Sequence, residues 1–186
     1  MNNEKDLTLK EAFDLAIQNH QSNNLQEAQN YYQKVLKIDS NHLGANYNLG
    51  ILFKNLKENQ KAKSCFEKAI KTNPNHVNAH NNLGNIFKKS AENQKAKDCY
   101  EKVIKLNPNH TPAHNNLGAI FNKLGEYLKA KICYEKAIEI DPNYTDAHYN
   151  LGNIYKLLAE DQKAISCYQK AIEIDPNYTD AHYNLG

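Results

Sequence analysis

Apolar residues recur along the chain at intervals of three and four residues, which is the spacing of one face of an α-helix. Between residues 111 and 124 this face consists of Ala113, Leu117, Ile120, Phe121 and Leu124. A second apolar face follows, made of Ala130, Tyr134, Ala137 and Ile138. Gly125 and Glu126 predict a turn between the two faces, and Pro142 ends the second because proline cannot continue a helix. The pattern therefore predicts a pair of helices.

This pair of helices recurs every 34 residues. The period is marked by the Leu-Gly pairs Leu49-Gly50, Leu83-Gly84, Leu117-Gly118, Leu151-Gly152 and Leu185-Gly186. It predicts one continuous array with a lead-in at 1–8, a degenerate first repeat at 9–42, and further repeats at 43–76, 77–110, 111–144 and 145–178. Residues 179–186 are the truncated start of a sixth repeat, so we expect the chain to be a fragment of a longer protein.

The conserved positions of each unit resemble the tetratricopeptide repeat (TPR), a 34-residue helix–turn–helix with Leu-Gly, an aromatic residue, Ala-x3-Phe and Pro. In the second unit these are Leu49-Gly50, Phe53, Ala62, Phe66 and Pro74. Asn-Leu-Gly in the first helix is most similar to the superhelical TPR array of O-GlcNAc transferase. The family's tryptophan slot instead holds Asn46, His80, His114, His148 and His182. The resemblance implies an all-α, right-handed α-solenoid of stacked helix–turn–helix repeats, whose first helices line a concave, peptide-binding groove.

Helical geometry places positions 5, 6, 9, 12 and 13 of each unit opposite the apolar face, on the side that the resemblance assigns to this groove. The predicted peptide-binding residues at positions 5 and 6 are Tyr47, Asn48, Asn81, Asn82, Asn115, Asn116, Tyr149, Asn150 and Asn184. Those at positions 9, 12 and 13 are Asn85, Asn153, Lys54, Lys88, Lys89 and Lys123. An asparagine amide donates and accepts hydrogen bonds, so a row of amides can hold a peptide backbone. The alternative is that these asparagines face solvent and are copied from one ancestral repeat.

Composition narrows the class of protein. The chain has 186 residues, 24% of them charged, and a net charge of +2, which excludes a disordered polyelectrolyte. It contains no arginine and no apolar run long enough to span a membrane, so we expect neither a nucleic acid nor a membrane partner. Residues 43–110 carry 12 lysines against 5 acidic residues, which favours either an acidic partner or a solvated helix face. The first twenty residues lack a signal peptide, so we expect a cytoplasmic protein.

No pattern of catalytic or metal-binding residues is visible. The four cysteines are 34 residues apart and fall beside core aromatics, so we expect packed thiols. His76 and His80 are four residues apart, as are His110 and His114, but neither pair has a glutamate placed as a general base. We therefore expect no enzyme activity, cofactor or metal in this fragment, and a module that binds a protein or an extended peptide. Two alternatives remain: a substrate-recognition arm of a glycosyltransferase-like enzyme whose catalytic domain follows Gly186, or an array that self-associates end to end through its uncapped last repeat.

Overall fold

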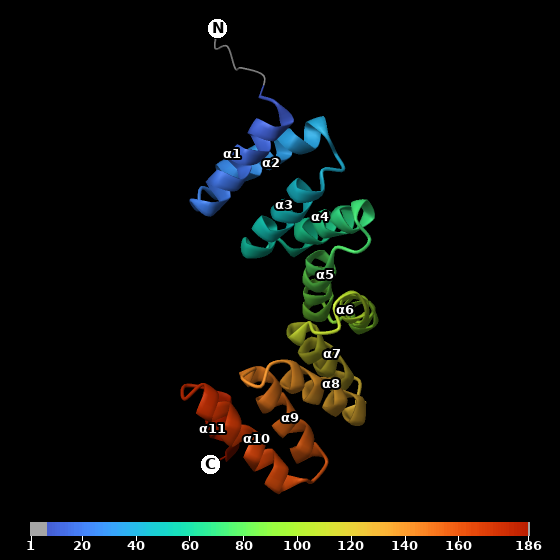
Figure 1. Ribbon diagram of the computed structural model, residues 1–186, viewed down its shortest axis with the longest axis vertical. Helices are drawn as coiled ribbons and strands as arrows, with labels where there is room; N and C mark the ends of the chain where they lie inside the picture. Colours follow the sequence, from blue (N-terminus) through green and yellow to red (C-terminus); the bar gives the residue numbers. More distant parts are fainter. Residues whose placement is uncertain (1–6, 186) are drawn as a thin grey trace. The chain divides into compact units, whose positions relative to one another are not determined.

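Eleven α-helices make up the regular structure of residues 7–185, the part of the chain that the computed structural model describes (Figure 1). They are α1 (Leu9–Gln21), α2 (Leu25–Ile38), α3 (Leu43–Asn55), α4 (Asn59–Thr72), α5 (Val77–Lys89), α6 (Asn93–Leu106), α7 (Thr111–Lys123), α8 (Tyr127–Ile140), α9 (Thr145–Leu157), α10 (Asp161–Ile174) and α11 (Thr179–Leu185). No strand occurs among these described residues. Most of the predicted lead-in, residues 1–6, and the predicted last residue of the array, Gly186, lie outside them.

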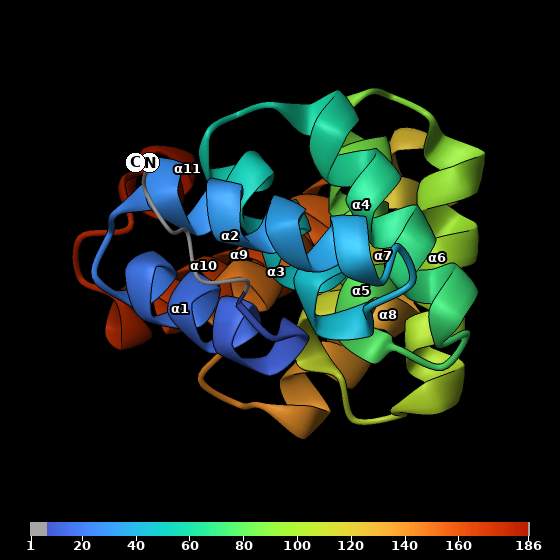
Figure 2. The ribbon, with the colours of Figure 1, turned by 90° about the horizontal axis from the view of Figure 1, so that it is seen from above.

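Odd-numbered helices are the first helices of the repeats and even-numbered helices are the second. The chain forms two compact units, residues 1–86 and residues 87–186. In the first unit, α1 packs along α2 (Figure 2), α3 packs along α4, and α2 also contacts α3. In the second unit, α7 packs along α8 and α9 along α10, while α6, α8 and α10 each contact the next first helix. Within each unit, a second helix is therefore held between the first helices of two successive repeats.

The turn after each first helix is built on a backbone conformation with positive φ. The residues at this position are Asn23, Lys57, Ala91, Gly125 and Ala159, with φ between 56° and 74°. In the fourth repeat, the amide of Gly125 donates to the carbonyl of Asn122, and that of Glu126 donates to the carbonyl of Phe121. Glycine adopts this conformation without strain, whereas other residues do so at a cost. The predicted turn at Gly125-Glu126 is confirmed.

Small residues allow the two helices of a repeat to approach closely. Phe66, Tyr134 and Tyr168 of the second helices are at most 1% exposed. Each ring lies against the glycine of the Leu-Gly pair, and a Cβ added at Gly118 would lie 2.7 Å from Cε1 of Tyr134. The close approach that the sequence predicts at Gly118 is therefore present.

The apolar face of the first helices is buried as predicted, with one exception. In α3, the side chains of Ala45, Leu49, Leu52 and Phe53 are at most 5% exposed. The last apolar position of the pattern is different, because Leu56 is 40% exposed and Leu124 is 45% exposed. Both residues are the C-caps of their helices, where the chain turns away from the core. The assignment of Leu124 to the buried face was therefore wrong.

Candidate functional site

The first helices carry a row of asparagines, one in each of five repeats. We call this the asparagine row: Asn48, Asn82, Asn116, Asn150 and Asn184. We call the side of the first helices that bears positions 5, 6, 12 and 13 the first-helix face. The structure shows what each amide of the row contacts, and the two compact units can be described separately.

In the unit formed by residues 87–186, the asparagine row makes hydrogen bonds across the repeat boundaries. The side-chain amide of Asn150 donates to Oδ1 of Asn115 at 3.0 Å, and that of Asn184 donates to the hydroxyl of Tyr149 at 3.3 Å. The ammonium of Lys88 donates to Oδ1 of Asn116 at 2.5 Å. Each asparagine is thus bonded to position 5 or position 12 of the preceding repeat.

The unit formed by residues 1–86 shows the same arrangement. Lys54 Nζ donates to Oδ1 of Asn82 at 3.0 Å, and the hydroxyl of Tyr47 also lies near Asn82. The amide nitrogen of Asn82 donates to the carbonyl of Asn78, and the side chain is only 8% exposed. Asn48 lies near the hydroxyl of Tyr32 in the preceding repeat and opposes the rise in the pKa of this hydroxyl that burial causes. Sequence reasoning placed Tyr47, Lys54 and Asn82 on one face but did not foresee the contacts among them.

The tyrosines at position 5 of the repeats, next to the asparagine row, are partly packed. The ring of Tyr149 lies 5.9 Å from that of Tyr168 and 5.2 Å from that of Tyr178. The ring of Tyr47 lies 5.9 Å from that of Phe66, and burial raises the pKa of its hydroxyl. Both tyrosines keep part of their surface exposed, so apolar contact with a ligand remains available to them.

The other predicted site residues differ in exposure. Lys89 and Lys123 are exposed, whereas Lys54 and Lys88 are half-buried. Asn115 is only 6% exposed. Asn153 accepts a hydrogen bond from the hydroxyl of Tyr168 at 2.8 Å. Asn81 and Asn85 are half-buried on α5, and Oδ1 of Asn81 is a buried acceptor without a hydrogen-bond partner in the described part of the chain.

Histidines stabilise the turns between repeats. Nε2 of His114 lies 2.9 Å from the carbonyl oxygen of Pro108, and the same contact joins His148 to Pro142. Nδ1 of His76 and Nδ1 of His110 accept hydrogen bonds from backbone amides at the start of α5 and α7. Within residues 7–185, no group of three or more His, Cys, Asp or Glu side chains is placed to hold a metal ion.

The cysteines lie in the core of the second helices. Cys65, Cys99 and Cys133 are at most 9% exposed, and Cys167 is half-buried. Burial raises the pKa of the thiols of Cys65, Cys133 and Cys167 to about 11. These thiols are therefore protonated at neutral pH and act as small apolar side chains, as the sequence predicted.

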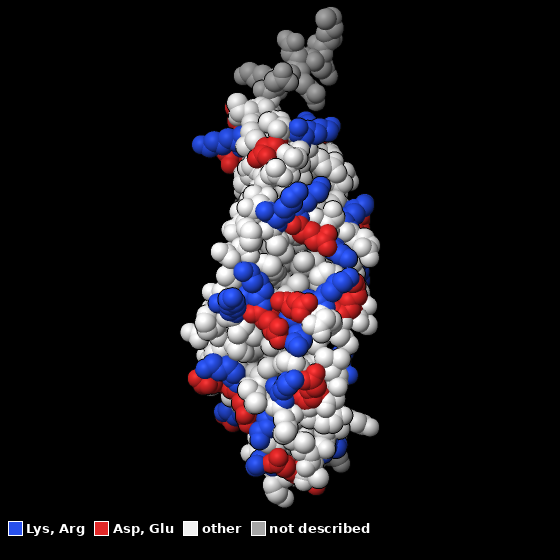
Figure 3. Space-filling view, turned by 90° about the vertical axis from the view of Figure 1, so that its right-hand side faces the viewer, with Lys and Arg blue, Asp and Glu red and all other residues white. Residues whose placement is uncertain are grey.

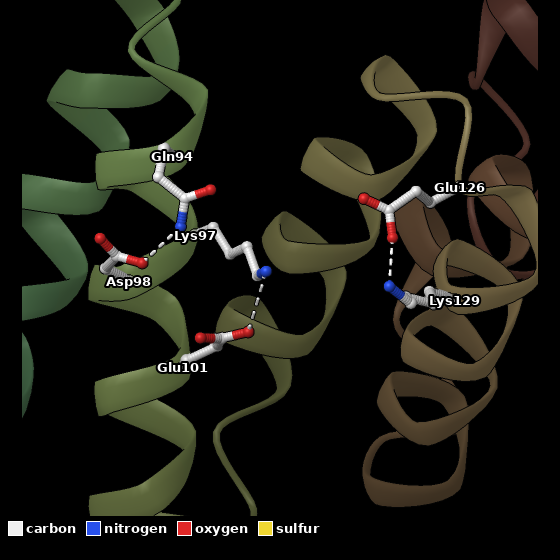
Figure 4. Close-up of polar contacts among 6 residues, drawn as sticks. All are labelled: Gln94, Lys97, Asp98, Glu101, Glu126 and Lys129. Atoms are coloured by element: carbon white, nitrogen blue, oxygen red, sulfur yellow. Dashed lines mark hydrogen bonds and ion pairs between the residues drawn. The ribbon is translucent and has the colours of Figure 1, made fainter.

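Lysines of the second helices cover the aromatic residue at position 11 of the first helices, a contact that sequence reasoning missed. Lys129 lies 5.4 Å from the ring centroid of Phe121, and Lys97 of the preceding repeat lies 5.6 Å from the same ring. Figure 4 shows that each of these lysines also pairs with a glutamate, Lys97 with Glu101 at 3.8 Å and Lys129 with Glu126. The regular 34-residue spacing of these lysines and rings was the sequence pattern that could have revealed the contact.

The family follows from comparison with known proteins. The sequence profile of the tetratricopeptide repeat family matches residues 45–76, 77–110, 111–144 and 145–178, and a second profile of the same repeat matches residues 19–42. The chain is a tetratricopeptide repeat protein. Comparison with curated proteins finds no match.

Solved structures similar to this TPR protein have the same fold. The crystal structure of YrrB, described as a TPR protein with an unusual peptide-binding site, is 26% identical, with a TM-score of 0.84 over 97% of this chain and 93% of that one. The crystal structure of MamA is also 26% identical, with a TM-score of 0.83 over 96% of each chain. PilF of Pseudomonas aeruginosa is 18% identical, with a TM-score of 0.79 over 93% of this chain and 79% of that one, and supports the fold alone.

The TPR protein therefore has the all-α solenoid fold of stacked helix–turn–helix repeats, as the sequence predicted. This fold forms protein–protein interaction modules and typically serves binding rather than catalysis. None of the helices in the described part of the chain is both long enough and apolar enough to cross a membrane.

Proposed function

We propose that this TPR protein binds an extended segment of a partner protein along its first-helix face. The observation that carries the proposal is the set of hydrogen bonds along the asparagine row. These bonds fix the amides of successive repeats in place before any ligand arrives. A ligand that meets fixed side chains loses less conformational entropy on binding than one that must order them.

The amides of the row retain hydrogen-bonding capacity. An asparagine side chain has two N–H donors and an oxygen with two lone pairs, so the bond from Asn150 to Asn115 leaves other groups of Asn150 available. Asn48, Asn116 and Asn150 are half-buried and thus reach the surface. Asn82 and Asn115, at 8% and 6% exposure, are better placed to orient their neighbours than to contact a ligand. We therefore assign the backbone contacts to Asn116 and Asn150 in the unit formed by residues 87–186, and separately to Asn48 in the unit formed by residues 1–86.

The similar structures support a peptide as the ligand. The structure of YrrB matches 97% of this chain, and YrrB is described as having an unusual peptide-binding site. An extended peptide offers one N–H and one C=O per residue, which suits a row of amides spaced along the first helices. Each such bond contributes only about 0.5–1.5 kcal/mol, so several repeats must act together.

A peptide library displayed on phage tests the proposal. The affinities of peptides selected on the wild-type chain are then measured by fluorescence anisotropy, both for the wild type and for the variant Asn116→Ala/Asn150→Ala. The matched control is Asn109→Ala/Asn143→Ala, which removes two exposed asparagines from the turns between repeats. We expect the first variant to lose about tenfold or more in affinity and the control to bind as the wild type does.

Circular dichroism establishes that both variants remain helical. If no peptide is selected, or if both folded variants bind equally well, the first-helix face is not the binding site. The two alternatives drawn from the sequence, a recognition arm of a larger enzyme and an array that associates end to end, stay predictions.

A further inference from the structure

Three successive first helices contain no acidic residue at all. The segments of α3, α5 and α7 include no aspartate or glutamate, whereas each of them carries one or two lysines in its last turn. Among the first helices, aspartate and glutamate occur only in those nearer the two ends of the chain, such as Asp14 in α1 and Asp146 in α9.

The second helices show the opposite arrangement. Their lysines pair with glutamates three or four residues away, as in Lys95–Glu92, Lys131–Glu135, Lys136–Glu139 and Lys170–Glu173. Figure 3 shows lysine and acidic side chains next to one another over one face of the molecule. In α8 and α10 these pairs neutralise most of the positive charge, whereas α4 and α6 each carry four lysines and keep a net positive charge.

On the first-helix face of residues 87–186, four lysines have no such partner, and Lys156 of α9 is one of them. Within the described part of the chain, no carboxylate lies at ion-pair distance from Lys88, Lys89 or Lys123. Lys88 and Lys89 end α5, and Lys123 ends α7 exactly one repeat after Lys89 in the sequence. We call these three residues the lysine cluster.

One member of the lysine cluster, Lys88, is held in place by a hydrogen bond. Asn116 fixes the ammonium of Lys88 at 2.5 Å from its Oδ1. Burial of Lys88 and the nearby positive charges of Lys123 and Lys89 lower its pKa, and Asp146 offsets only part of this effect. The carboxylate of Asp146 already accepts a hydrogen bond from the hydroxyl of Tyr178 at 3.0 Å. The cluster is thus a site where an additional negative charge is favoured.

We propose that Lys88, Lys89 and Lys123 bind an acidic stretch of the extended partner segment, an inference that rests on the proposed function. An aspartate or glutamate of the ligand would form charge-assisted hydrogen bonds with these ammonium groups and relieve their mutual repulsion. The neighbouring amides of Asn116 and Asn150 would hold the backbone on either side of it. The uncompensated positive charge would also accelerate the encounter with an acidic ligand.

A nucleic acid phosphate would meet the same positive charge but fits this face less well. The whole chain lacks arginine, the side chain that binds phosphate in a bidentate manner. Single-stranded nucleic acids also stack their bases on exposed aromatic rings. The ring of Tyr149 already packs against Tyr168 and Tyr178, which leaves only part of its surface for a base to stack on.

The test uses synthetic probes of one length. They are a 12-residue peptide with four glutamates, the same peptide with glutamine in their place, the same peptide with lysine there, and a 12-nucleotide single-stranded DNA. Affinities are measured for the wild type and for Lys89→Gln/Lys123→Gln, which changes two exposed side chains and spares the bond between Lys88 and Asn116. The matched control, Lys136→Gln/Lys170→Gln, removes two charges from the second helices.

We expect the glutamate peptide to bind at least tenfold more tightly than the glutamine peptide, with a preference that weakens as salt is added. Lys89→Gln/Lys123→Gln should abolish this preference, and the control should keep it. Equal binding of the glutamate and glutamine peptides overturns the acidic preference while leaving the proposed function intact. Binding of no peptide of any charge overturns both, and tighter binding of the DNA than of the glutamate peptide overturns the assignment to a protein ligand.

Discussion

Asn150 donates a hydrogen bond to Asn115 at 3.0 Å, which joins the first helices of the fourth and fifth repeats through side chains alone. Asn115 is 6% exposed, so its oxygen would be left without a partner in a site that water reaches poorly if Asn150 were truncated. The same type of bond links Tyr149 to Asn184 one repeat later. The asparagine row therefore contributes to the stability of the boundary between repeats, whatever it binds.

A double-mutant cycle measures this contribution. We expect Asn115→Ala and Asn150→Ala each to destabilise the fold, and the double variant to be less destabilised than the sum, with a coupling of about 0.5–1.5 kcal/mol. Chemical unfolding followed by circular dichroism provides the free energies. Strictly additive effects would show that the bond contributes nothing to stability.

The turn after each first helix predicts a stabilising substitution. Ala159 has φ of 56°, and the equivalent Gly125 has φ of 74°. Ala159→Gly should raise the free energy of unfolding by about 0.5–1 kcal/mol, because the left-handed strain that it removes outweighs the entropy that glycine adds to the unfolded chain. Gly125→Ala should lower it by a similar amount, since no neighbouring atom lies within 4 Å of the added Cβ and only the backbone is affected. Opposite signs in thermal unfolding would support this explanation, and equal signs would contradict it.

Cysteine reactivity follows from burial. The pKa of the Cys133 thiol is raised from 9.0 to about 11, so the thiolate fraction at pH 8 is roughly 100-fold lower than for an exposed cysteine. We expect alkylation by iodoacetamide to be slow in the native protein and fast in denaturant. Because the folded pKa lies above the unfolded one, the contribution of this thiol to stability is fully present below pH 9 and is lost as the pH rises towards 11. Rapid native-state alkylation at pH 8 would disprove the assignment.

The fourth repeat carries two exposed aliphatic residues on its second helix. Leu128 is 67% exposed and Ile132 is 64% exposed. At the equivalent positions of the third repeat, Gln94 donates to Asp98 at 2.8 Å (Figure 4), and the fifth repeat has Gln162 and Ser166. The fold therefore does not require apolar residues at these positions.

We expect Leu128→Gln/Ile132→Ser to change the free energy of unfolding by less than about 0.5 kcal/mol, because both side chains are already in water. The variant should also remain soluble at higher concentration than the wild type. Chemical unfolding and light scattering measure the two effects. A loss of more than about 2 kcal/mol would show that these side chains are buried in the protein, contrary to the structure.

Much of the fold was predictable because a helix has a fixed period. The spacing of apolar residues indicated both helices of each repeat, and the 34-residue period indicated how many there are. The close approach at Gly118 was also predictable, since the glycine recurs opposite an aromatic residue. The exposure of Leu124 was not, because the period of a helix does not reveal the residue at which the chain leaves it.

The candidate site was predictable only in part. Helical geometry placed Asn116 and Asn150 on one face, but it describes one helix at a time. Whether the amide of Asn150 contacts a ligand or Asn115 depends on how two successive first helices are set against each other. The packing of one first helix against the next is tertiary structure, and the pattern of residues within a single repeat does not predict it.

From Asn82 onward, the bonds of the asparagine row join position 6 of one repeat to position 5 or position 12 of the preceding repeat, and this has a consequence for how such a chain changes in length. If residues 111–144 were deleted, Lys88 would face Asn150 in the register in which it now faces Asn116. A duplicated unit would likewise bring its own asparagine next to the side chains at positions 5 and 12 of the unit before it. The array can therefore gain or lose whole repeats by recombination, and each new junction finds a donor and an acceptor already in place.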